Sequence, residues 1–129
     1  MLYKTRKLVK PPDLNPSNTL FGGQLLKWID EEAAVFAMCK FGNNHVVTKY
    51  MSEIDFINPA YSGDIVEIGC EVISVGRTSL TLRSEVRIKD TETVIIRIEK
   101  IVLVHVDNSG RPKAHGMTLE TLRTETITN

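Results

Sequence analysis

Residues 22–40, GGQLLKWIDEEAAVFAMCK, carry the longest helical pattern in the chain and decide how the rest is arranged. Apolar side chains recur there at steps of three and four residues, which is the spacing of one helix face: Leu26, Ile29, Ala33, Phe36 and Ala37. The run ends at residues 41–44, FGNN, because a glycine commonly follows the last turn of a helix. We therefore predict one long helix from Gly22 to about Lys40.

Patterns typical of strands lie on both sides of this helix. An extended stretch, residues 1–10, precedes it and ends at two prolines. Four stretches follow it, of which the second alternates cleanly between apolar and polar residues: 45–56, 64–75, 79–89 and 93–106. We predict an α+β fold in which a curved antiparallel sheet of about five strands wraps the helix, the last four in meander order. One helix cannot cover both faces of a sheet, so we also expect self-association.

Size and charge limit the classes of function. The 129 residues suit one domain, which we place at residues 1–113 and follow with a polar tail at 114–129. Sixteen basic residues balance sixteen acidic ones, so no overall field attracts nucleic acid or an anionic membrane. No apolar run approaches the roughly twenty residues that span a bilayer. We expect neither a nucleic-acid nor a membrane partner.

Two cysteines, Cys39 and Cys70, are too few and too far apart for a zinc site or a disulfide framework. Both are interpreted as small buried side chains. The first residues are basic but lack the apolar core of a signal peptide, so the expected compartment is the cytoplasm.

Asp30 is the acid of the helix that lies on or just beside the apolar stripe, whereas Glu31 falls on the solvated face. A carboxylate in such a place is costly unless it is paired or used. It either pairs with a basic residue across a dimer interface or acts as a general base or nucleophile in a cleft. The spacing alone leaves both readings open.

The helix begins at two glycines, Gly22 and Gly23. They allow a ligand to approach the first-turn N–H groups, where the positive end of the helix dipole suits a carbonyl oxygen that becomes negative. The same pair also fits a tight turn with close packing. Asn15 and Asn18, in the preceding turn, either orient a carbonyl or a water molecule or simply shape the turn.

Residues 15–34, NPSNTLFGGQLLKWIDEEAA, resemble the acyl-CoA thioesterases of the hot-dog fold, specifically the cytosolic acyl-CoA hydrolase family and its single-domain bacterial type. The resemblance continues in order through four shorter motifs: DFINP at 55–59, SGD at 62–64, VGRTS at 75–79 and VLVHVD at 102–107. It implies a central helix wrapped by a five-stranded sheet, dimers that share a continuous sheet, and a hexamer as a trimer of dimers.

The resemblance also implies a site. The catalytic acid of the family falls on Asp30 and its asparagine on Asn15, and the two meet from opposite subunits. The oxyanion donors fall near Gly23, beside Gly22, and the turn that contacts the phosphates of coenzyme A falls on Arg77-Thr78-Ser79.

Asn18 departs from the family, because relatives carry glycine in this part of the loop that approaches the thioester. Asparagine tolerates a positive φ, so we expect the turn to survive while the side chain narrows the acyl entrance.

The function expected from both lines of argument is hydrolysis of acyl-CoA to a free fatty acid and coenzyme A. Asp30 either activates water or attacks directly to form an anhydride. No metal or organic cofactor is expected, since coenzyme A is part of the substrate. The alternative is a non-catalytic acyl-CoA sensor of the same fold. A dehydratase is disfavoured because the three histidines, at 45, 105 and 115, lie outside the glycine turn.

Overall fold

The computed structural model describes residues 1–122 and contains the predicted long helix as α1, Gly22–Phe41. A short 3-10 helix, Pro11–Asp13, precedes it. Six strands complete the fold: β1 Leu2–Leu8, β2 Val46–Met51, β3 Ile54–Phe56, β4 Ile65–Val75, β5 Ser79–Ile88 and β6 Val94–His105. The helix ends where predicted, because Gly42 adopts a left-handed φ of 77° and its N–H closes the last turn on the carbonyl of Met38.

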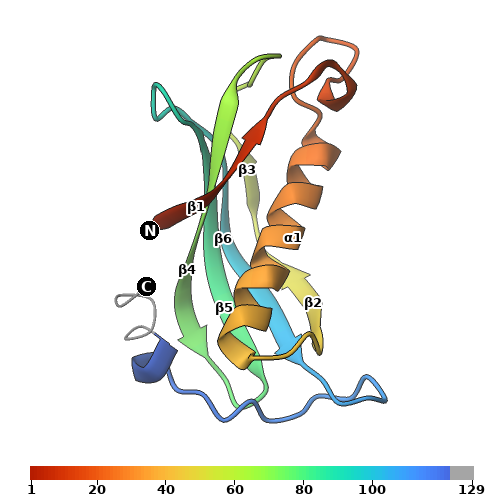
Figure 1. Cartoon of the computed structure of the whole chain (residues 1–129), viewed down its shortest axis with the longest axis vertical. Coiled ribbons are helices and arrows are strands. Elements are labelled where there is room, and N and C mark those ends of the chain that lie inside the picture. Colours follow the sequence, from red (N-terminus) through yellow and green to blue (C-terminus); the bar gives the residue numbers. More distant parts are fainter. Residues whose placement is uncertain (123–129) are drawn as a thin grey trace.

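The strands form one antiparallel sheet in the order β1-β4-β5-β6-β2, with β3 also paired to β6. The sheet curves around α1, which lies along its concave side (Figure 1). The prediction of an α+β fold with a curved sheet around one helix is confirmed. The sheet has six strands where about five were expected.

The predicted meander order of the last four strands is wrong for the first of them. β2 pairs with β6, the last strand, and not with its neighbour in sequence, β4. The chain leaves α1 at the end of the sheet where β6 terminates, so it returns along the free edge of β6, while β1 fills the edge beside β4. Alternation of apolar residues predicts strands, but it does not predict which strands pair.

The stretch 45–56 was expected as one strand and is two, β2 and β3. The register of β2 on β6 shifts between Thr48 and Tyr50, and β3 continues the register of Tyr50 and Met51 after an interruption at Ser52 and Glu53. The Ser52 hydroxyl oxygen accepts the N–H of Lys100 at 2.8 Å, a bond that a backbone carbonyl makes in a regular ladder. The Ser52 side chain thus makes this bond at the point where the strand is interrupted, while the Ser52 N–H still bonds the Lys100 carbonyl at 2.8 Å.

The core lies between α1 and the concave face of the sheet. The buried helix residues are centred on positions four apart, Leu25, Ile29, Ala33 and Ala37, with Trp28 beside them. Cys70 is buried on β4, as expected. Cys39 is exposed, contrary to the prediction, because it lies on the outer side of the last turns of α1.

Part of the predicted polar tail packs against the end of the sheet. Met117 is partly buried against the core, and Leu122 is fully buried. Residues 123–129 of that tail lie outside the described residues. The domain limit after Lys113 stays a prediction.

Candidate active site

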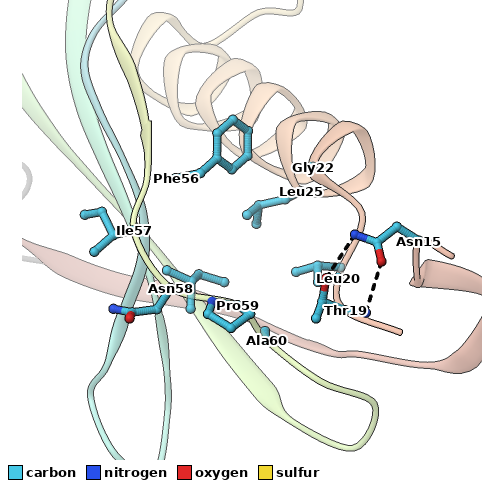
Figure 2. A pocket seen from close by; sticks show the side chains of 11 residues that line it. Asn15, Thr19, Leu20, Gly22, Leu25, Phe56, Ile57, Asn58, Pro59 and Ala60 are labelled. Carbon is cyan, nitrogen blue, oxygen red and sulfur yellow. Dashed lines mark hydrogen bonds between the residues drawn. The ribbon is translucent and has the colours of Figure 1, made fainter. Parts of the chain in front are cut away.

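The turn that leads into α1 is organised by the side chain of Asn15. Its amide oxygen accepts the N–H groups of Ser17 at 2.9 Å and Thr19 at 3.2 Å, and its amide nitrogen donates to the Thr19 hydroxyl at 2.9 Å (Figure 2). Asn18 has a φ of 63°, and its N–H bonds the carbonyl of Asn15. Asn15 therefore shapes the turn, and its role in orienting a carbonyl or a water molecule stays a prediction. The positive φ expected at Asn18 is confirmed.

Asp13 connects this turn to the helix, a role that the sequence did not predict. Its carboxylate is buried and accepts the N–H of Lys10 and the side-chain amide of Gln24, each at 2.9 Å. Gln24 belongs to the first turn of α1, so one carboxylate fixes both ends of the segment that carries Asn15. The sequence gives no sign of the bond between Asp13 and Gln24, because two residues eleven positions apart meet only through the path of the turn between them.

The first turn of α1 is open at its N-terminus. Phe21 occupies the N-cap and offers no side-chain acceptor, and the first helical bond runs from Leu25 N–H to the Phe21 carbonyl. The first-turn N–H groups of Gly22 and Gly23 therefore have no side-chain cap. Neither position has free room for a side chain: a Cβ on Gly22 would lie 3.2 Å from the Phe56 ring, and one on Gly23 would lie 2.6 Å from the Phe21 ring, so these rings would have to move.

A pocket of about 320 Å³ opens beside this helix start (Figure 2). Its polar wall is formed by Asn15, Thr19 and Gly22. Its apolar wall comes from the turn, α1 and the segment after β3: Leu20, Leu25, Phe56, Ile57, Pro59, Ala60 and Ile95. Asn58 completes the lining. A pocket with a few polar groups at one end of an apolar cavity is the usual form of a small-molecule site.

Asp30 does not line this pocket. Eight residues of helix separate it from Gly22, or about 12 Å along the axis. Its carboxylate accepts a hydrogen bond of 2.7 Å from the hydroxyl of Thr48 on β2, so it faces the edge strand of the sheet. Thr48 is the second partner that the sequence did not reveal, because the contact depends on β2 lying beside α1. One protomer thus does not bring Asp30 and Asn15 into the same pocket.

A second cavity, of about 450 Å³, brings Thr48 near the turn that was expected to contact phosphates. Thr78 and Ser79 line it together with Thr48 and Lys49 of β2. Its other walls come from β6 and from the loop that follows β6. Arg77 is exposed at the tip of the turn and is not among the lining residues. Two of the three predicted turn residues therefore share a cavity with the partner of Asp30.

Two further features of residues 1–122 bear on the kind of site. No group of three or more histidine, cysteine, aspartate or glutamate side chains there is placed to hold a metal ion. Within the same range, no helix is both long enough and apolar enough to cross a bilayer.

Comparisons with known proteins agree with this architecture. Residues 17–95 match the family model of the Thioesterase superfamily. An uncharacterized acyl-CoA thioester hydrolase of Haemophilus influenzae is 30% identical over 125 residues, which cover 89% of this chain and 80% of the relative.

Two solved structures give the same picture. A hexameric thioesterase of Yersinia pestis superposes with a TM-score of 0.80 at 28% identity, over 88% of this chain and 93% of that one. An acyl-CoA hydrolase of Staphylococcus aureus, in complex with butyryl coenzyme A, coenzyme A and coenzyme A disulfide, superposes with a TM-score of 0.72 at 32% identity, over 85% of this chain and 66% of that one. The predicted hot-dog fold is confirmed by these likenesses.

The Staphylococcus aureus hydrolase has also been solved as three alanine variants, of an aspartate, an asparagine and a threonine. The substituted asparagine and aspartate of that protein are fifteen positions apart, the same separation as Asn15 and Asp30 here.

Proposed function

The chain belongs to the thioesterase superfamily, and from this premise we propose that it hydrolyses acyl-CoA to a free fatty acid and coenzyme A. The observation that carries the proposal is the pocket where the open glycine start of α1 meets apolar side chains. The apolar wall of this pocket can hold an acyl chain, and the uncapped N–H groups of the first turn of α1 can donate to a thioester carbonyl.

The proposed oxyanion site is the N–H of Gly23, with Gly22 leaving room for the substrate. Charge develops on the carbonyl oxygen during attack, and preorganised N–H donors with the helix dipole stabilise that charge. The Asn15 amide has two hydrogens, of which Thr19 takes one. In our proposal the second hydrogen orients the carbonyl or the attacking water.

The proposed catalytic acid is Asp30 of the partner subunit. Two observations support a shared site: Asp30 lies about 12 Å along the helix from Gly22, and it faces β2, whose outer edge pairs with no strand of residues 1–122. Pairing of β2 with its copy would bring each Asp30 toward the other protomer. The proposed assembly is a dimer with a continuous sheet, and a trimer of such dimers, in line with the hexameric Yersinia pestis relative.

Two routes for the chemistry remain in the proposal. In the first, Asp30 removes a proton from water, the hydroxide adds to the carbonyl carbon, the carbon–sulfur bond breaks, and the thiolate of coenzyme A leaves. In the second, the carboxylate adds directly, expels the thiolate and forms an anhydride that water then opens. Both need no cofactor beyond the substrate.

The proposed coenzyme A contacts are Arg77, Thr78 and Ser79. The cavity shared by Thr78, Ser79, Thr48 and Lys49 supports this assignment, because it places two of the three turn residues beside β2, the strand whose Thr48 hydroxyl bonds Asp30. Asn18 is proposed to narrow the acyl entrance. The proposed compartment is the cytoplasm, and the two free thiols fit a reducing environment.

The test is thiol release from acyl-CoAs ranging from acetyl to palmitoyl, for wild type, Asp30→Asn and the control Glu31→Gln. We expect wild type and Glu31→Gln to turn over the same substrates, because the Glu31 side chain is exposed and leaves the helix about 100° around its axis from Asp30. Asp30→Asn should lose at least about a hundredfold in kcat, since an amide neither accepts the proton nor attacks.

Turnover by Asp30→Asn within a few fold of wild type would refute the catalytic assignment. The alternative, a non-catalytic acyl-CoA sensor, predicts a different result. In that case no acyl-CoA is hydrolysed by the wild type, yet acyl-CoA still raises its melting temperature.

A further inference from the structure

The segment after β6 folds back onto the Arg77–Ser79 turn. We call residues 111–118 the C-terminal strap. It runs along the end of the sheet, below the last turn of α1 (Figure 1). A single bridge, Val106 to Pro112, and the bond from Lys113 N–H to the His105 carbonyl pair its beginning with the end of β6.

Two histidines hold all three backbone carbonyls of the turn. His115 donates its N–H to the Arg77 carbonyl at 3.2 Å and its ring Nε2 to the Ser79 carbonyl at 3.0 Å. The N–H of His105 bonds the Thr78 carbonyl at 2.8 Å. Apart from the internal bond between Gly76 N–H and the Ser79 carbonyl, the described contacts that restrain these carbonyls come from His105 and His115.

The His115 ring is partly exposed and is held at both nitrogens and on one face. Its Nδ1 accepts the N–H of Met117 at 2.9 Å, so Nε2 carries the hydrogen that goes to Ser79. Its face stacks on Phe41 of α1, with centroids 4.9 Å apart and planes 11° from parallel. His105 meets the same phenylalanine edge-on and bonds the Lys113 carbonyl and the Asn43 amide. The His115 ring therefore connects the C-terminal end of α1, at Phe41, with the Ser79 carbonyl of the turn.

The carbonyl bonds also orient the donors of the turn. The peptide bonds of the described chain are trans, and in a planar trans peptide the next N–H points away from the carbonyl. The bond from the strap to the Arg77 carbonyl thus directs the N–H of Thr78 away from the strap, and the bond from His105 of β6 to the Thr78 carbonyl directs the N–H of Ser79 away from β6. Backbone N–H groups held in fixed directions beside an arginine are suited to a phosphate.

We propose that His115 is a positioning residue for substrate binding, which holds the Arg77–Ser79 turn in the conformation that accepts the phosphates of coenzyme A. This inference rests on the proposed function, since it takes acyl-CoA as the substrate. It goes further than that function, because it assigns the strap a role in the affinity for the nucleotide part of acyl-CoA. The strap has no role in the hydrolytic step. The cavity lined by Thr78, Ser79 and Pro112 is where the strap and turn meet.

The experiment compares two substrates with the same acyl group: the acyl-CoA, and the acyl thioester of N-acetylcysteamine, which lacks the nucleotide and its phosphates. For His115→Ala we expect KM for acyl-CoA to rise about three- to tenfold, the range for losing one or two hydrogen bonds, with kcat unchanged. The kcat/KM for the N-acetylcysteamine thioester should stay within about twofold of wild type, because this substrate does not reach the turn.

Two further variants separate positioning from general damage. His115→Gln keeps an N–H donor at the place of Nε2 and should restore most of the affinity for acyl-CoA. His45→Gln is the matched control, because His45 is exposed before β2 and its ring makes none of the described contacts with the strap. It should leave both substrates unchanged.

The inference is overturned if His115→Ala lowers kcat/KM equally for both substrates, since that marks general structural damage, or if it changes neither. Titration calorimetry with coenzyme A decides the case independently of turnover. If wild type hydrolyses no thioester, the proposed function fails, but weaker coenzyme A binding by His115→Ala still supports the positioning role. Equal affinity in the two proteins, or no binding by either, refutes it.

Discussion

At the scale of single residues, the direction of the Asp30 carboxylate depends on Thr48. The 2.7 Å bond from the Thr48 hydroxyl holds one carboxylate oxygen against β2, which leaves the other oxygen free to act on a substrate or water. The sequence placed Asp30 correctly at the margin of the apolar stripe, where the structure finds it partly buried. It did not reveal Thr48, since a contact eighteen residues away depends on how β2 returns beside the helix.

Replacing Thr48 by valine tests this orientation, because valine keeps the shape and removes the hydroxyl. We expect kcat for acyl-CoA to fall about tenfold, the effect of losing one hydrogen bond to a charged group. KM should change little. Steady-state kinetics of Thr48→Val and Thr48→Ser measures the effect, and the serine variant, which keeps the hydroxyl, should retain most of the activity. An equal loss in both variants would show that the hydroxyl is not the cause.

The buried thiol of Cys70 gives the fold a dependence on alkaline pH. Burial raises the pKa of Cys70 from 9.0 to about 12, while the hydrogen bond with Ser84 opposes the shift. Below pH 9 the thiol is neutral in both states. Between pH 9 and about 12 the unfolded chain ionises first, so the thiol's contribution to stability is lost as pH rises.

We therefore expect the melting temperature of wild type to fall more steeply than that of Cys70→Ala between pH 8 and pH 10. The packing that Cys70→Ala loses is the same at pH 8 and at pH 10. The difference between the two proteins in how steeply the melting temperature falls with pH therefore reports the ionisation of the thiol. Thermal unfolding followed by circular dichroism provides the measurement. Parallel slopes for the two proteins would contradict the assignment.

At the scale of elements, the helix was predictable and the pairing of strands was not. The start at Gly22 and the end before Gly42 follow from local signals, a glycine pair and a left-handed C-cap. β2 and β3 are divided at Ser52, whose hydroxyl accepts the N–H of Lys100, and the pairing of β2 with β6 comes from the path around the helix. Neither leaves a mark in the alternation of apolar residues.

Gly42 offers a direct test of the helix C-cap. Its φ of 77° is unfavourable for residues with a Cβ, although nothing lies within 4 Å of where that Cβ would be. Gly42→Ala should therefore lower the free energy of unfolding by about 1–2 kcal/mol through the backbone alone. Urea denaturation measures it. Gly42→Asn is the control and should lose less, because asparagine tolerates this region better.

At the scale of the whole molecule, the exposed edge at β2 is the feature that a single protomer leaves incomplete. Val47 and Tyr50 on this strand are about half exposed, and the other side of β2 has no partner in the described chain. Such an edge invites pairing with another chain. The catalytic proposal needs this pairing, since Asp30 and the glycine pocket lie apart in one protomer.

A charge on this edge should separate the subunits. We expect Tyr50→Glu to dissociate the dimer and to abolish acyl-CoA hydrolysis together with it. Leu2→Glu places the same charge on β1, the opposite edge of the sheet, and should leave both properties intact. Analytical ultracentrifugation and thiol release on the same samples give the answer. A Tyr50→Glu monomer with wild-type activity would refute the shared site.

The most direct measurement of the central claim is complementation between two inactive variants. Asp30→Ala lacks the acid and Gly23→Val blocks the helix start, so each alone should be inactive. In mixed assemblies formed from equal amounts of the two, an active site needs the acid from one chain and the pocket from another. Random mixing should then restore about a quarter of wild-type thiol release, whether the assembly is a dimer or a trimer of dimers. No recovery in mixtures whose subunits have demonstrably exchanged would contradict a site built from two subunits.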